Sequence, residues 1–119
     1  MPEALIWNRI ALKYKTRYIN EKLLIINYRS DGLSAHSVRV RRDNPNNSVF
    51  YYKEFINMMP VSLKWKIRNL VNYSRFSFHA GKGIKKQVKE INHMIMKFIL
   101  IFIFPFTLCF YLKDLKSKN

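Results

Sequence analysis

The chain has 119 residues and carries 22 Lys and Arg against 7 Asp and Glu, a formal net charge of +15. This length allows one small domain, and self-repulsion at this charge disfavours a compact state unless a polyanion lies nearby. The usual polyanions are nucleic acids and the anionic surface of a membrane. A soluble enzyme is therefore a poor match to the composition.

The titratable residues form no catalytic or metal-binding pattern. The seven acidic residues are scattered, the three histidines are dispersed, and Cys109 is the one cysteine. Acid–base catalysis needs two titratable groups held together, and a structural zinc site needs Cys and His ligands at characteristic spacing. We expect neither an enzyme nor a protein that binds a cofactor or a metal.

The basic charge precedes the apolar end of the chain. Of the 22 basic residues 18 lie in residues 1–92, together with six of the seven acidic ones. We expect residues 1–92 to form a basic region that faces RNA or the mitochondrial matrix. We expect residues 93–119 to form an apolar C-terminal helix with a polar tail. Because few acids offset the repulsion, residues 1–92 are not expected to fold alone.

In chain order, residues 4–28 have the spacing of an amphipathic helix. Apolar side chains recur every three or four residues at Ile6, Ile10, Tyr14 and Tyr18, and most basic residues lie off that stripe. We expect the stripe to pack against a neighbour. Stacking on bases and lying on a lipid surface are the alternatives.

Small polar residues predict a loop over residues 29–37. The next stretch, SVRVRR (residues 37–42), alternates, with Val38 and Val40 on one side and arginines on the other. The alternation predicts a half-buried strand or an extended basic arm, and a turn follows at residues 43–47 (DNPNN). Guanidinium groups on such an arm suit the phosphates of RNA or phospholipid; a solvated strand face is the alternative.

The centre of the chain is apolar and aromatic over residues 49–59, and Pro60 ends that segment. Ser62 is a candidate N-cap for a short helix over residues 63–71, which has an apolar face with a basic flank. The stretch FSFHAGKG, residues 76–83, predicts a connector.

Residues 84–112 predict one continuous helix that is basic at its start and apolar at its end. Its 15 uncharged residues, 98–112, span roughly 22 Å, whereas a bilayer core requires about 20 residues. Lys97 just before the run can snorkel, and the kink expected at Pro105 is tolerated better in membrane helices than in soluble ones. The run fits either a short membrane anchor or an element buried in a large assembly.

One stretch resembles a known family. Met59-Pro60, Ser62, the run Lys66-Ile67-Arg68-Asn69 and then Ser74-Arg75 are similar to the centre of the fourteenth protein of the small ribosomal subunit, in its zinc-free bacterial and organellar branch. That family reads Leu-Pro, a serine, Arg-x-Arg-Asn and a Gly-Arg pair after a basic helix. The resemblance covers residues 9–86. Ser74 stands where the family has glycine, and the apolar C-terminal end has no counterpart there.

The resemblance implies a mostly extended protein with short helices, bound to ribosomal RNA in the head of the small subunit. By motif position, Lys66, Arg68, Asn69 and Arg75 would contact that RNA. The basic arm, the basic helix flank and the interleaved aromatic residues point to RNA independently. The full set of predicted RNA contacts is Arg39, Arg41, Arg42, Lys64, Lys66, Arg68, Asn69, Arg75, Lys82, Lys85 and Lys86.

The expected fold is mainly α, with short amphipathic helices, extended basic arms, little independent core and the apolar C-terminal helix. Abundant Ile, Lys, Asn, Phe and Tyr with only three Gly is typical of an AT-rich genome, as in many organelles. No cleavable N-terminal signal is expected, because Arg9, Lys13 and Lys15 interrupt the first apolar stretch.

The first functional hypothesis is a structural RNA-binding protein of the mitochondrial ribosome, an obligate member of a large assembly whose partners are ribosomal RNA and neighbouring ribosomal proteins. The alternative is a single-pass accessory subunit of an inner-membrane respiratory or ATP synthase complex, in contact with lipid and other subunits and with residues 1–92 in the matrix. A third hypothesis is a tail-anchored protein of the outer mitochondrial membrane.

Overall fold

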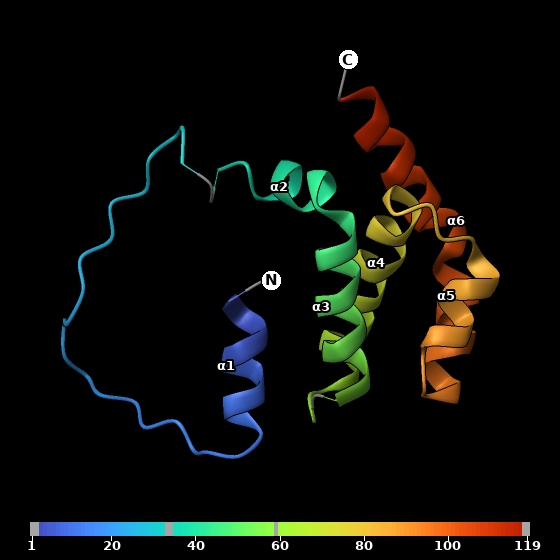
Figure 1. The fold of residues 1–119 in the computed structure, drawn as a ribbon. Helices are drawn as coiled ribbons and strands as arrows, with labels where there is room; N and C mark the ends of the chain where they lie inside the picture. The colour runs from blue at the N-terminus through green and yellow to red at the C-terminus, as the bar shows by residue number, and fades with distance from the viewer. Residues whose placement is uncertain (1–2, 33–34, 59, 118–119) are drawn as a thin grey trace.

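The computed structural model describes residues 3–32, 35–58 and 60–117. Within these ranges the chain forms six α-helices and no strand (Figure 1). The mainly helical fold with an apolar C-terminal helix is therefore confirmed. In chain order the helices are α1 (Glu3–Ala11), α2 (Ser37–Asp43), α3 (Pro45–Met58), α4 (Leu63–His79), α5 (Ile84–Glu90) and α6 (Met94–Lys116).

Some predictions fall partly on residues outside the described ranges. These residues belong to the start of the basic region, the predicted loop, the family-like motif and the polar tail. They are Met1, Pro2, Leu33, Ser34, Met59, Lys118 and Asn119.

Helices α3, α4 and α6 form the packed centre of the molecule, and α4 lies between the other two (Figure 1). α2 contacts α3 and α4, α5 contacts α6, and α1 stands beside α3 at the end of a long exposed loop. The radius of gyration is 16.0 Å, against about 13–14 Å for a compact domain of this length. The molecule is therefore somewhat extended.

The core is a single small cluster to which α3, α4 and α6 all contribute. Ile56 of α3, Phe76 of α4 and Leu100 of α6 are fully buried in it. Tyr52 of α3 stacks on Phe76, with ring centroids 5.9 Å apart and planes 4° from parallel. Because α6 supplies part of this cluster, the C-terminal helix belongs to the fold rather than being appended to it.

The N-terminal helix is shorter than the predicted residues 4–28. α1 ends at Ala11, and residues 15–29 are non-helical and exposed. Leu5 is the buried side chain of α1. Helices in proteins are stabilised mainly by packing of an apolar face, and none of the later apolar side chains is buried. The stripe that was predicted to pack against a neighbour is exposed in this chain, at Ile6, Ile10, Tyr14 and Tyr18.

Residues 37–42 form helix α2, so the predicted strand or extended arm is wrong. A half-buried strand needs a neighbouring strand to bond the backbone groups that water cannot reach, and the described part of the chain contains none. In helix α2 the backbone groups form hydrogen bonds within the helix and with side chains that follow it. Ser48 Oγ donates to the carbonyl oxygen of Arg41 at 3.1 Å, and Asn44 Nδ2 donates to that of Val40 at 3.2 Å.

Pro45 and Ser62 stand at the starts of the two central helices. Pro45 opens α3, where a turn over residues 43–47 was predicted, because the fixed φ of proline suits the first helical position. Ser62 occupies the predicted N-cap position of α4, although its side chain makes no capping hydrogen bond. α4 also continues into the predicted connector, residues 76–83, because Phe76 is fully buried in the core.

The prediction of a single helix over residues 84–112 is wrong, because the helix is interrupted between α5 and α6. The side chain of Asn57 on α3 forms hydrogen bonds on both sides of this interruption. Its Nδ2 donates to the carbonyl oxygen of Glu90 at 3.3 Å, and its Oδ1 accepts from the N–H of Asn92 at 3.0 Å. Between them Ile91 is fully buried with φ −91° and ψ 129°. The burial of Ile91 and the Asn57 hydrogen bonds together stabilise extended backbone here.

Candidate nucleic-acid interface

An open groove of about 530 Å³ lies along α3 and α4, with one residue each from α1 and α2 at its rim. We call it the α3–α4 groove. Its wall is aromatic, and its polar groups are guanidinium, amide and hydroxyl groups. No carboxylate is among the residues that line it, which are Ala4, Arg41, Ser48, Tyr51, Tyr52, Phe55, Trp65, Arg68, Asn69 and Asn72.

Trp65 and Arg68 form the α4 side of the groove. Three residues apart on a helix, they share one face, and the Arg68 Cζ lies 5.3 Å from the centroid of the Trp65 ring. Trp65 keeps 51% of its surface exposed, and Arg68 is exposed as well. The groove therefore presents a planar aromatic face and a cation side by side.

Arg41 brings a second guanidinium to the groove from α2. Its Nη1 donates to the hydroxyl oxygen of Tyr52 at 3.3 Å. Burial raises the pKa of Tyr52 and outweighs the opposing effect of Arg41, so the phenol is protonated and neutral at physiological pH. A neutral acceptor orients Arg41 without neutralising it, and the guanidinium stays available to an anion.

Asn69 and Asn72 add amide groups along the same side of α4. The Nδ2 of Asn69 donates to the backbone carbonyl oxygen of Trp65 at 2.8 Å, which fixes the orientation of the amide. Guanidinium groups bind phosphate oxygens in a fork, an aromatic face stacks on bases, and amides bond base edges. These are the groups that contact single-stranded RNA.

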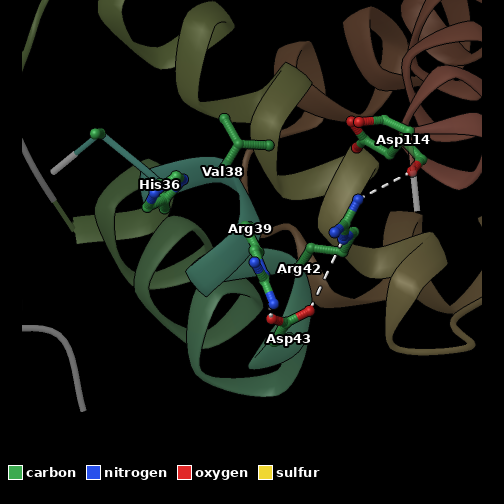
Figure 2. Close-up of a pocket in the computed structure, with 8 residues that line it drawn as sticks. His36, Val38, Arg39, Arg42, Asp43 and Asp114 are labelled. Carbon is green, nitrogen blue, oxygen red and sulfur yellow. Dashed lines mark hydrogen bonds and ion pairs between the residues drawn. The ribbon is translucent and has the colours of Figure 1, made fainter. Parts of the chain in front are cut away.

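A second hollow, of about 710 Å³, lies beside α2 (Figure 2). Arg39 and Arg42 line it, but so do Asp43 and Asp114. Arg42 Nη1 donates to the carbonyl oxygen of Asp114 at 3.0 Å, and both arginines lie 3.8 Å from the Asp43 carboxylate. These arginines already have acidic partners, so this hollow suits an anionic ligand less well than the α3–α4 groove.

Two further predicted RNA contacts, Lys82 and Arg75, also form ion pairs within the chain. Lys82 Nζ lies 2.9 Å from both carboxylate oxygens of Glu90. Arg75 donates from Nε to Asp114 Oδ2 at 2.6 Å and from Nη2 to Oδ1. His79 completes that cluster, with its Nε2 3.2 Å from Asp114 Oδ2.

The Asp114 carboxylate is held as an anion at the centre of this cluster. Burial opposes its ionisation, but the hydrogen bonds from Arg75 and His79 outweigh burial and hold the pKa of Asp114 below its ordinary value. A charged carboxylate between two donors joins α4 to the last turns of α6. Arg75 therefore has a tertiary role in this structure.

The structure brings together only part of the predicted set. Arg41, Arg68 and Asn69 meet in the α3–α4 groove, while Arg39 and Arg42 meet in the hollow beside α2. The remaining lysines are on other surfaces: Lys64 is exposed and Lys66 half-buried on α4, and Lys85 and Lys86 are exposed on α5.

The sequence prediction missed the aromatic wall of the groove. Trp65 was identifiable, because the run LKWKIRN places it three residues before Arg68. Asn72 was identifiable by the same spacing, four residues after Arg68. Tyr51 and Phe55 gave no comparable signal, since each reaches the groove only through the packing of α3 against α4.

A scan against protein-family models, a search of the curated proteins and a search of the solved structures find no match to this chain. Within residues 3–32, 35–58 and 60–117 no three His, Cys, Asp or Glu side chains lie close enough to hold a metal ion.

Proposed function

We propose that the protein is a structural RNA-binding component of an organellar, mitochondrial ribosome. The observation that supports this best is the α3–α4 groove, in which Arg41 and Arg68 flank the exposed face of Trp65 with no carboxylate in the lining. Phosphate attraction with aromatic stacking is the usual way of binding single-stranded RNA. The partners proposed are ribosomal RNA and neighbouring ribosomal proteins.

The overall charge supports the same proposal. A net charge of +15 favours an assembly with a polyanion, and the exposed Lys15, Arg17 and Lys22 add further basic side chains beyond the groove. The extended shape also fits a protein that gains contacts from an assembly. The ordered core alone is small.

The family-like motif contributes to the groove through two of its residues. Arg68 and Asn69 line it, whereas Arg75 is bonded to Asp114. We therefore assign RNA contact to Arg68 and Asn69, and the joining of α4 to α6 to Arg75.

The test is RNA binding by the full-length chain across a range of salt concentrations. Log affinity for single-stranded RNA should fall linearly with log salt, with a slope of about −0.7 for each phosphate contacted. Replacing Arg41 and Arg68 together by alanine should weaken binding and flatten the slope. Arg29→Ala is the matched control, because Arg29 is exposed and outside the groove.

In the organelle, the proposal requires co-sedimentation with the small ribosomal subunit. The protein should leave that particle at high salt together with the other peripheral proteins. A protein that stays with membranes at every salt concentration and never sediments with ribosomal subunits would contradict the proposal.

A second candidate function is a single-pass subunit of an inner-membrane complex. The 23 residues of α6 are long and apolar enough to cross a bilayer, and only 17% of the most apolar window is buried. For α6 to span a bilayer it would have to separate from α4, because α4 carries the exposed charges of Lys64 and Arg68, which are costly inside the bilayer core. Extraction at alkaline pH separates the two candidates, because a spanning helix stays in the pellet and a peripheral protein is released.

A further inference from the structure

Helix α6 has two different faces. Its inner face packs on α4 and buries Leu100, Thr107 and Asp114. The opposite side is exposed, with Phe98 at 68% and Phe102 at 81%. We call this side the outer face of α6; its residues, spaced by three or four, are Met94, Phe98, Ile101, Phe102, Pro105, Phe106, Cys109 and Leu112.

The inner face is attached to α4 at several levels. Ser74 Oγ and Thr107 Oγ1 are hydrogen-bonded at 3.0 Å in the buried interface. Arg75 holds Asp114 two turns further along, and the rings of Phe78 and Tyr111 lie 5.5 Å apart. With these contacts in place, the inner face of α6 is closed to lipid.

Helices α5 and α6 carry a surplus of positive charge. Both acidic residues of α5 and α6 are occupied, Glu90 by Lys82 and Asp114 by Arg75. Lys113 and Lys116 continue the spacing of the outer face beyond Cys109. Six lysines on these two helices have no ion-pair partner among the described residues: Lys85, Lys86, Lys89, Lys97, Lys113 and Lys116.

We propose that the outer face of α6 lies flat on an anionic phospholipid bilayer. An apolar helix face bordered by lysines is the pattern of helices that rest in the interface, with the apolar side about 5–10 Å below the headgroups. Each lysine near an anionic surface adds about 1 kcal/mol of attraction. The Phe side chains enter the acyl boundary, and the lysines of α5 and α6 contact the acidic headgroups.

Charge favours lipid over a second copy of this chain. Two copies meeting through α6 would bring two chains of net charge +15 and their flanking lysines together, and repulsion opposes that contact. The outer face also offers no side-chain hydrogen-bonding group between Phe98 and Leu112 other than the Cys109 thiol. A protein interface normally includes several hydrogen bonds, whereas a bilayer needs none.

This surface is separate from the α3–α4 groove, since no residue of α6 lines that groove. Bilayer and RNA can therefore be bound at the same time. The proposal does not depend on RNA binding, because none of the residues it uses lines the α3–α4 groove. If both proposals hold, the protein attaches the ribosome to a membrane surface.

Cys109 allows a direct test, because it is exposed and is the one cysteine of the chain. The full-length protein is labelled there with an environment-sensitive fluorophore and mixed with vesicles of phosphatidylcholine and phosphatidylglycerol. Emission should rise and shift to the blue, and the effect should be weak with phosphatidylcholine alone. No change with the anionic vesicles would overturn the proposal.

Substitutions separate the outer face from general basic attraction, with vesicle flotation as the readout. Phe102→Asp should weaken binding about tenfold or more, since it removes a large apolar side chain from the acyl boundary. Phe50→Asp is the matched control on α3, where Phe50 is 43% exposed, and should change binding less than twofold. Equal vesicle binding by the two variants would overturn the proposal. It would also be overturned if the protein bound no vesicles but formed a dimer that Phe102→Asp dissociates.

Depth distinguishes a helix on the surface from one that spans. Fluorophores at Cys109, or at position 101 in an Ile101→Cys, Cys109→Ser variant, are quenched with nitroxides at shallow and deep positions of the lipid. A flat helix gives two equal, shallow depths. A spanning helix places position 101 near the centre of the bilayer, and that result would overturn the proposal.

A third variant links the result to the RNA proposal. Arg68→Ala should leave vesicle binding unchanged, because Arg68 lies on α4 in the groove. Loss of vesicle binding in Arg68→Ala would show attraction through the basic surface rather than α6, and would overturn the proposal. If the unsubstituted protein binds vesicles but does not bind RNA, only the function proposed above is refuted.

Discussion

Arg75 of α4 and Asp114 of α6, 39 residues apart in the chain, form a two-pronged ion pair. Both side chains are largely buried, with 19% and 8% of their surface exposed. His79 and the guanidinium of Arg42 reach the same residue, at the carboxylate and at the backbone carbonyl respectively. One acidic residue thus joins α2 and α4 to the C-terminal end of α6.

Asp114→Asn should destabilise the fold by about 1–3 kcal/mol, because it leaves a largely buried guanidinium without its counter-charge. The urea midpoint of the full-length chain measures the change. The matched control is Asp31→Asn, which breaks the bidentate but exposed pair of Arg29 and Asp31. That change should cost well under 1 kcal/mol, and equal losses would contradict the tertiary role of Asp114.

Acid should weaken the fold partly through Asp114. Its native pKa lies below the ordinary value, so the contribution of this group is complete above the unfolded pKa of about 4 and is lost as pH falls through the native pKa. Asp114→Asn should flatten stability against pH in that range. Some slope should remain, since Arg9 lowers the pKa of Glu54 and Lys82 lowers that of Glu90, the latter against burial.

Trp65→Ala and Arg68→Ala should weaken binding to single-stranded RNA in different ways. Loss of one stacking ring costs about 1–3 kcal/mol and should leave the salt dependence of binding unchanged. Loss of one phosphate contact should reduce the slope of log affinity against log salt by about 0.7. Arg39→Ala, outside the groove and next to Asp43, is the control. Identical slopes for the three variants would argue against phosphate contact by Arg68.

A chain that ends after residue 92 should fail to fold cooperatively. It lacks Met96 and Leu100 of the core and the Asp114 partner of Arg75, while most of the positive charge remains. Circular dichroism at low salt should show a broad change with temperature rather than a sigmoidal melt. A cooperative melt of residues 1–92 would mean that α3, α4 and α5 are stable without α6.

Local patterns predicted the elements whose physics is local. The uncharged run of residues 98–112 predicted an apolar helix at the C-terminal end, and Ser62 predicted the start of α4. Local patterns failed where the secondary structure of a segment depends on contacts with another element. The SVRVRR alternation suited a strand, but no neighbouring strand exists in the described chain to bond it.

By itself the sequence determined the charge, the helical class and the apolar end, because these depend on composition and short-range spacing. Only the tertiary structure decided that Asn57 breaks the helix predicted for residues 84–112 and that Asp114 binds Arg75. It also decided that Arg41 and Trp65, from different helices, line one groove. Each of these joins residues far apart in the chain, and such contacts depend on how helices pack, which no local spacing encodes.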